Sequence, residues 1–220
     1  MYKWDFGILW GYRWLFLQGL GVTVAFTIAI VVFGLLIGLL AGLGTLSRLR
    51  ALRWLSSAYV EFFRCTPLLV QLIWFYYAMP VLSGLEMSAV SASVVALSLY
   101  GGSFYAEIIR GGIVSIDAGQ SEAGAAIGMT PFQIMRRIVL PQAFKRMLPP
   151  LMNQSIIQFK NTSLVSVIAV PDLVYQSQIA AHDSYRPLEL YTAVAVIYFV
   201  ILFPLTLLVH VGERKLATSD

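Results

Sequence analysis

Long apolar runs separated by short polar segments dominate the chain. No charged side chain occurs from residue 14 to residue 47, and further apolar runs cover residues 65–85, 87–106, 147–171 and 190–212. Crossing about 30 Å of hydrocarbon takes about 20 helical residues, so each run is long enough for one membrane-spanning helix. We therefore predict five spans, the first near residues 18–45, with an interfacial and partly amphipathic stretch at residues 53–64 before the second.

The composition agrees with this pattern. Of the 220 residues, 59% are apolar and 12% are charged, whereas a soluble domain carries about 25% charged residues. Disorder, a nucleic-acid-binding module and an ordinary cytosolic enzyme are therefore excluded, and we expect one integral membrane domain over residues 1–220. The N-terminal run is not followed by a small-residue cleavage site, so no removable signal peptide is expected.

The basic residues gather on alternate connections between the predicted spans. They are Arg48, Arg50 and Arg53 after the first span, Arg110, Arg136, Arg137, Lys145 and Arg146 after the third, and Arg214 and Lys215 in the tail. Lys and Arg concentrate on the cytoplasmic side of membrane proteins. This distribution predicts an N-terminus outside the cell and a C-terminus in the cytoplasm.

Three glycines of the first span share one face. Gly34, Gly38 and Gly42 follow one another at four-residue spacing. Small residues at this spacing let the backbones of two membrane helices approach closely. We predict that another helix packs against this face.

The connection between the third and fourth spans is longer than joining them requires. Residues 115–145 contain a stretch rich in small residues, with Ala123, Ala125 and Ala126 ahead of Gly128, and glycine commonly follows a helix end. A threonine cap and a proline at residues 130–131 predict the start of a second helix, which we expect to end at Pro141. The pattern indicates a helix–turn–helix exposed on the cytoplasmic face. A hairpin that merely lies on the lipid headgroups is the alternative at this point.

This loop resembles the EAA signature of the membrane-spanning subunits of ABC importers. The signature reads Glu-Ala-Ala, three residues, Gly, nine residues, Ile, one residue and Leu-Pro. The matching positions here are Glu122, Ala123, Gly128, Ile138, Leu140 and Pro141, and the departure is Gly124 in place of the second alanine. Residues 59–64, 66–71 and 160–164 also resemble the polar amino acid (histidine/glutamine-type) permeases, with Cys65 where glycine is usual.

The resemblance implies an all-α type I ABC importer permease fold, with five transmembrane helices and a cytoplasmic coupling loop between the third and fourth. It implies a multi-pass protein of the bacterial inner membrane that forms the path for a polar amino acid. The residues implied to couple to an ATPase are Glu122, Ala123, Gly124, Gly128, Ile138, Leu140 and Pro141.

The same resemblance sets the expected partners. They are a dimer of cytoplasmic ATP-binding subunits, a second permease subunit (identical or paralogous) and an extracytoplasmic solute-binding protein; nucleic acid is not expected. The chain has no Gly-x-x-x-x-Gly-Lys-Ser/Thr loop, so we expect ATP and Mg²⁺ to bind the partner. We expect no catalytic residue, metal site or cofactor in this chain.

Polar side chains inside the fourth span are the candidates for the translocation path. Intramembrane polar groups face a bundle interior or a water-filled cavity. The candidates are Gln154, Gln158, Lys160, Asn161, Thr162 and Ser163. Spacings of three and four place most of them on one face, where amides and hydroxyls suit an α-carboxylate or α-amino group. For Lys160, the one formal charge deep in a span, a structural role and a substrate or gating role both stay open.

Other classes of membrane protein fit the sequence less well. An ion-coupled secondary transporter or a channel subunit also shows segregated charge, but this chain is short and has no acidic residue in mid-span. An intramembrane protease needs a nucleophile and a base together in the bilayer, and the serines of the fourth span lack a histidine partner. The sequence leaves open which amino acid is carried and whether the second permease is identical to this one.

Overall fold

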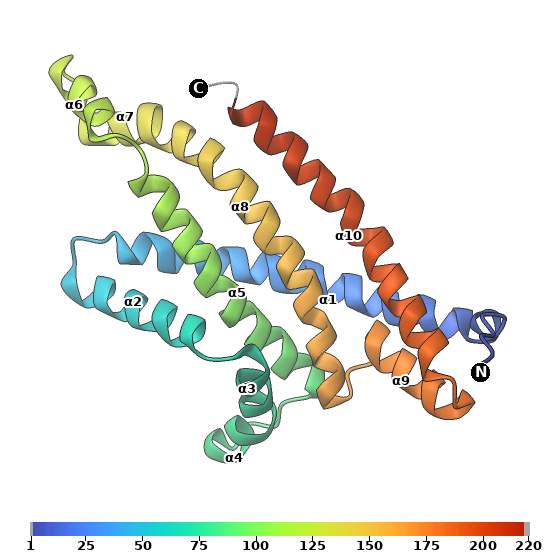
Figure 1. Cartoon of the computed structure of the whole chain (residues 1–220). Helices are drawn as coiled ribbons and strands as arrows, with labels where there is room; N and C mark the ends of the chain where they lie inside the picture. The colour runs from blue at the N-terminus through green and yellow to red at the C-terminus, as the bar shows by residue number, and fades with distance from the viewer. Residues whose placement is uncertain (1, 218–220) are drawn as a thin grey trace. The chain divides into compact units, whose positions relative to one another are not determined.

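A computed structural model describes residues 2–217, and every regular element in that range is helical. The elements, labelled in Figure 1 where space allows, are α1 (Ile8–Thr45), α2 (Arg50–Cys65), α3 (Leu68–Ile73), η1 (Trp74–Ala78), α4 (Met79–Ser83), α5 (Ala89–Val114), α6 (Ala118–Ala126), α7 (Pro131–Ile134), η2 (Met135–Val139), α8 (Leu140–Asn161), η3 (Thr162–Ile168), α9 (Leu173–Ser184) and α10 (Pro187–Ala217). The chain divides into a first unit of residues 1–32, 66–98 and 155–206 and a second unit of residues 33–65, 99–154 and 207–220.

Helices α1, α5 and α10 are each long and apolar enough to cross a membrane. The remaining apolar segments are bent. Helix α2 meets the segment Leu68–Ser83 at 105°, and the segment Pro131–Ile168 meets α9 at 48°. Counting each bent pair as one span gives five, the number that the sequence predicts.

The first helix begins earlier than predicted. Helix α1 starts at Ile8 rather than near residue 18, and it contains Arg13. The guanidinium of Arg13 donates to the backbone carbonyl of Trp10 at 2.5 Å and lies 4.6 Å from the centre of the Trp10 ring and 5.7 Å from that of Trp14. Because a carbonyl and two aromatic faces receive this cation, the charge does not end the helix.

The glycine face of α1 packs against α5 in the second unit, as predicted. A Cβ added at Gly38 would lie 2.5 Å from the Cβ of Tyr105 and 2.9 Å from the carbonyl oxygen of Gly102, and one at Gly42 would lie 2.8 Å from the carbonyl oxygen of Ala106. The two backbones therefore touch along this face. Helix α2 also contacts α5, because the hydroxyl of Tyr59 in α2 donates to the carbonyl of Leu99 at 2.6 Å.

The first unit has its own core around α9 and the ends of two long helices. Its buried members are Phe16, Leu173, Ala180, Ala181, Leu190 and Val194. The hydroxyl of the buried Thr23 donates to the carbonyl of Gly19 at 3.0 Å and accepts from the backbone amide of Leu173 at 3.1 Å. The second of these hydrogen bonds joins α1 to the start of α9.

Candidate functional site

The first arm of the hairpin is α6, and its two ends are defined by local hydrogen bonds. The carboxylate of Asp117 accepts from the backbone amide of Gly119 at 2.6 Å. At the other end, the amide of Gly128 donates to the carbonyl of Ala125 at 3.0 Å and that of Met129 to Gly124 at 3.1 Å. This pair of bonds is the Schellman motif, which needs a left-handed residue after the helix end. Gly128 supplies it with φ of 81°, so the predicted turn is confirmed.

The second arm begins as predicted but does not end as predicted. The hydroxyl of Thr130 accepts from the amide of Gln133 at 3.3 Å, and the side chain of Gln133 accepts from the amide of Thr130 at 2.8 Å, which together form a capping box before Pro131. The predicted end at Pro141 is wrong, because α7 continues through η2 into α8.

The π-helical turn η2 explains how the helix passes this proline. The amide of Leu140 bonds the carbonyl of Met135, five residues earlier. A proline inside an α-helix has no amide to donate, and its ring conflicts with the carbonyl four residues before it. The wider turn directly ahead of Pro141 relieves this conflict, and π-turns of this kind occur frequently at functional sites.

The two arms pack together through the position where the sequence departs from the EAA signature. Gly124 is buried, and a Cβ added there would lie 2.9 Å from Cδ1 of Ile138 and 3.0 Å from Cγ1 of Ile134. The small residue therefore lets α6 lie close to the second arm. Ile138, a predicted coupling residue, belongs to this internal contact and is half-buried.

The outer surface of the hairpin carries the other predicted coupling residues. They are all exposed: Glu122, Ala123, Gly128, Leu140 and Pro141, together with Ala125 and Ala126. Beside them the side chains of Ile127 and Phe132 are 78% and 72% exposed. Large apolar side chains grouped among small residues on an exposed tip are typical of a protein-binding surface. The exposure of Phe132 became visible only with the fold.

The base of the hairpin is tied by contacts that sequence reasoning missed. The guanidinium of Arg146 donates to the carbonyl of Ser115 at 2.6 Å and lies 3.4 Å from its hydroxyl. We call this contact between Arg146 and Ser115 the clasp. In the same unit Ala143 and Met147 are buried against Ile109. A Cβ added at Gly112 would overlap the side chain of Met147. The sequence marked Arg146 only as a cytoplasmic charge, because its partner is a backbone carbonyl 31 residues away.

The six candidate path residues of the fourth span occupy different environments. Gln158 and Thr162 are fully buried in the first unit. The amide nitrogen of Gln158 donates to the carbonyl of Leu97 at 3.1 Å, and its oxygen accepts from Asn161 at 3.0 Å. The hydroxyl of Thr162 donates to the carbonyl of Phe159 at 2.7 Å. These side chains bond the protein itself, and their part in a path stays a prediction.

Two other candidates lie nearer the surface of the first unit. The side chain of Lys160 is exposed, and in the described part of the chain it forms no ion pair. Ser163 is half-buried and donates to the carbonyl of Lys160 at 2.7 Å. In the second unit, Gln154 is buried, and its side-chain nitrogen has no hydrogen-bond partner among the described residues.

Comparison with known proteins identifies close relatives. The sequence profile of the family described as binding-protein-dependent transport system inner membrane component matches residues 34–218. The L-cystine transport system permease protein TcyB of Bacillus subtilis (strain 168) is 41% identical over 199 residues, covering 90% of this chain and 85% of the relative. The glutamine transport system permease protein GlnP of Escherichia coli (strain K12) is 35% identical over 215 residues, covering 97% and 98%.

The fold also matches a solved structure over nearly its whole length. A chain of the crystal structure of an amino acid ABC transporter with histidines superimposes with a TM-score of 0.92 at 38% sequence identity. The match covers 97% of this chain and 100% of that one.

Proposed function

Because the chain belongs to the family of binding-protein-dependent transport system inner membrane components and is a permease subunit of an ABC importer, we propose that it carries a polar amino acid across the bacterial inner membrane. The observation that carries the proposal is the match over residues 34–218, which includes both the hairpin and the fourth span. The substrates named for the relatives, cystine and glutamine, support a polar amino acid. The same membership favours an importer over an ion-coupled transporter or a channel.

We propose that the hairpin of residues 115–145 docks on a cytoplasmic ATP-binding subunit, which binds ATP and Mg²⁺. Its exposed tip offers Ile127 and Phe132 for burial, the small face of α6 for close approach and the carboxylate of Glu122 for a polar contact. The clasp between Arg146 and Ser115 keeps the base from opening when the tip is displaced. A movement of the ATPase thereby displaces α5 and α8 instead of only changing the conformation of the loop.

The assembly that we propose contains two permease subunits and an external solute-binding protein. The N-terminus lies outside and the C-terminus in the cytoplasm, on the basis of the alternating basic connections. With this orientation the hairpin faces the cytoplasm, where ATP is available.

For the path itself we propose that Lys160 attracts the α-carboxylate of the substrate. A cation inside a span is costly unless it is paired or hydrated, and in the described residues this ammonium has no acidic partner. Asn161 and Ser163, on the same segment and half-buried, add an amide and a hydroxyl beside it. Gln158 and Thr162 support this segment from within through their backbone contacts.

Uptake by the reconstituted transporter tests the proposal. The complex of this permease with its ATPase is placed in proteoliposomes, and the binding protein is added on the opposite side from the ATPase. It is expected to import a polar amino acid only when ATP is present on the side of the membrane where the ATPase lies. Uptake driven by an ion gradient in the absence of ATP would overturn the assignment. Lys160→Gln is expected to reduce uptake with unchanged basal ATP hydrolysis, and Lys160→Arg to retain most of it. Equal uptake by wild type and Lys160→Gln removes the proposed role of the ammonium.

A further inference from the structure

We propose that a groove between α1 and α10 binds one acyl chain of an anionic phospholipid, whose phosphate is held by Arg13. The groove lies wholly within the first unit and has a volume of about 680 Å³. Its walls are almost entirely apolar, with Leu9, Phe16, Leu17 and Leu20 from α1 and Val196 and Ile197 from α10. Volumes of about 300–1,000 Å³ are usual for binding sites of small ligands.

The groove runs along most of one leaflet of a bilayer. Its lining runs along α1 from the first turn to Leu20. At 1.5 Å per residue the seven steps from Arg13 to Leu20 rise about 10 Å, and half of a hydrocarbon core of about 30 Å is about 15 Å. With the phosphate at Arg13, the groove therefore covers about two thirds of the depth that one acyl chain occupies.

Arg13 is the single charged residue of the lining, and it gives the groove its preference for an anion. One terminal nitrogen of its guanidinium donates to the carbonyl of Trp10, and the guanidinium lies over the two tryptophan rings. The described residues provide no carboxylate for it.

A lipid phosphate satisfies this charge where the protein does not. Guanidinium groups bind phosphate through two parallel charge-assisted hydrogen bonds. The phosphate groups of a membrane lie at the edge of its hydrocarbon core, next to the first turns of the spanning helices. An anionic lipid thus meets both features of the site, with its phosphate at Arg13 and its chain in the apolar groove.

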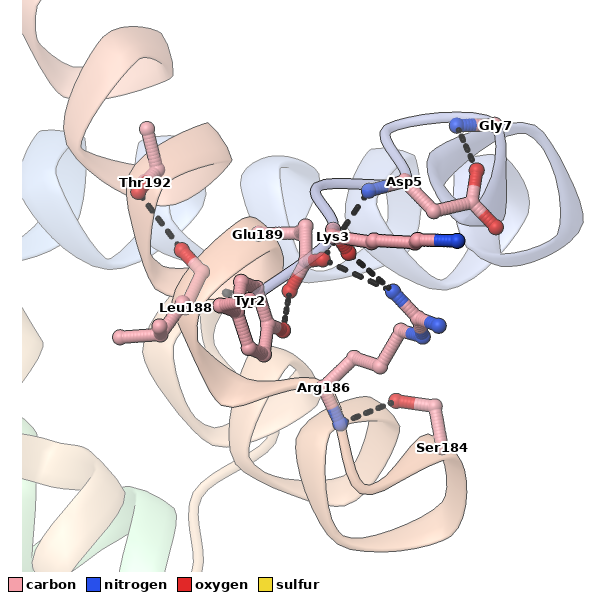
Figure 2. A network of polar contacts seen from close by, with 9 residues as sticks. All are labelled: Tyr2, Lys3, Asp5, Gly7, Ser184, Arg186, Leu188, Glu189 and Thr192. Carbon is pink, nitrogen blue, oxygen red and sulfur yellow. Dashed lines mark hydrogen bonds and ion pairs between the residues drawn. The ribbon is translucent and has the colours of Figure 1, made fainter.

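At the end of the groove nearest the starts of α1 and α10, the network in Figure 2 joins the segment before α1 to α10. The carboxylate of Glu189, fully buried at the start of α10, accepts from the hydroxyl of Tyr2 at 2.5 Å, the amide of Asp5 at 3.1 Å and the guanidinium of Arg186 at 3.1 Å. These bonds tie the segment before α1, which includes the groove residue Phe6, to α10. The two helix ends are therefore spaced before a lipid enters.

Native mass spectrometry of the purified transporter complex tests the proposal. The complex is exchanged into nanodiscs of either phosphatidylglycerol or phosphatidylcholine, released in mild detergent and measured for retained lipid. We expect phosphatidylglycerol to be retained preferentially by the wild type. Arg13→Gln is expected to lower its retention roughly tenfold, the effect of losing a hydrogen bond to a charged group. Ala193→Phe, which fills the groove, is expected to lower retention of both lipids.

Lys3→Gln is the matched control, because it removes a positive charge at the same end of the chain from a residue outside the groove lining. Its lipid retention is expected to equal that of the wild type. The proposal fails if Arg13→Gln retains phosphatidylglycerol as the wild type does, or if Lys3→Gln loses it equally. It also fails if a photo-crosslinking residue at position 17 labels a second permease chain in membranes instead of a lipid.

Discussion

Gly128 offers a direct test of whether the shape of the hairpin transmits force. Its φ of 81° lies in the left-handed region, and a Cβ added there would meet no atom within 4 Å. A substitution therefore changes the backbone preference of the turn without a steric clash. For a residue with a Cβ this conformation costs about 1–2 kcal/mol, and asparagine tolerates it better than most. Valine, being β-branched, tolerates it least.

These costs translate into a graded loss of the native turn. An increase of about 1–2 kcal/mol lowers the ratio of native to unwound turns by a factor of about 5–30. The number of amino acid molecules imported per ATP hydrolysed is measured in proteoliposomes. This ratio is therefore expected to fall from the wild type through Gly128→Asn and Gly128→Ala to Gly128→Val. ATP hydrolysis itself is expected to persist, because the nucleotide sites belong to the partner subunit.

The control for this series is Gly111→Ala. Gly111 also has open space around it but lies within α5 without a positive φ, so its replacement is expected to leave the import ratio unchanged. Wild-type coupling in Gly128→Val would refute the reasoning. So would a series in which asparagine performs worse than alanine, because the effect would then follow polarity rather than backbone conformation.

Three further perturbations test the packing and the polar contacts of the fold. Gly38→Ala places a methyl group against the backbone of α5, and in thermal unfolding it is expected to destabilise the detergent-solubilised complex by about 1–3 kcal/mol. Gly21→Ala, which has open space around it in the same helix, is expected in the same assay to be neutral or stabilising by up to about 1 kcal/mol. Arg146→Gln is expected to speed hydrogen exchange at the base of the hairpin, and Lys145→Gln, which changes the neighbouring exposed cation, is not. The hydrogen bond to the buried carboxylate of Glu189 raises the pKa of Tyr2 above its ordinary value. This bond therefore stabilises the N-terminal segment at pH values below the ordinary tyrosine pKa of about 10 and is lost as the pH rises past the folded-state pKa. Tyr2→Phe is expected to abolish that step in tryptophan fluorescence.

The ends of the hairpin arms were predictable because their signals are local. A threonine cap followed by proline, and a glycine after a run of small residues, act through hydrogen bonds within one turn. The expected stop at Pro141 failed for the opposite reason. Whether a proline ends a helix depends on the hydrogen bonding of the preceding turn, and η2 supplies a register that the residue pattern does not show.

The start of the first helix shows a limit of reading spans from uncharged windows. The window began after Arg13, and the helix was expected to begin inside it. The structure extends α1 to Ile8 because the guanidinium bonds a carbonyl one turn away and lies against two rings. A charge count assigns a cation its full cost of burial, although these contacts within the first turns offset much of it.

The polar residues of the fourth span show why a shared face is not yet a path. In a membrane every polar group needs a partner, and a backbone carbonyl serves as well as a substrate. Periodicity records only that the groups point the same way. Gln158 already donates to the carbonyl of Leu97 and Thr162 to that of Phe159, so donating instead to a substrate requires either side chain to give up an existing hydrogen bond. Lys160 requires no such exchange, and this difference ranks its ammonium ahead of the buried amide and hydroxyl as the first contact for a carboxylate.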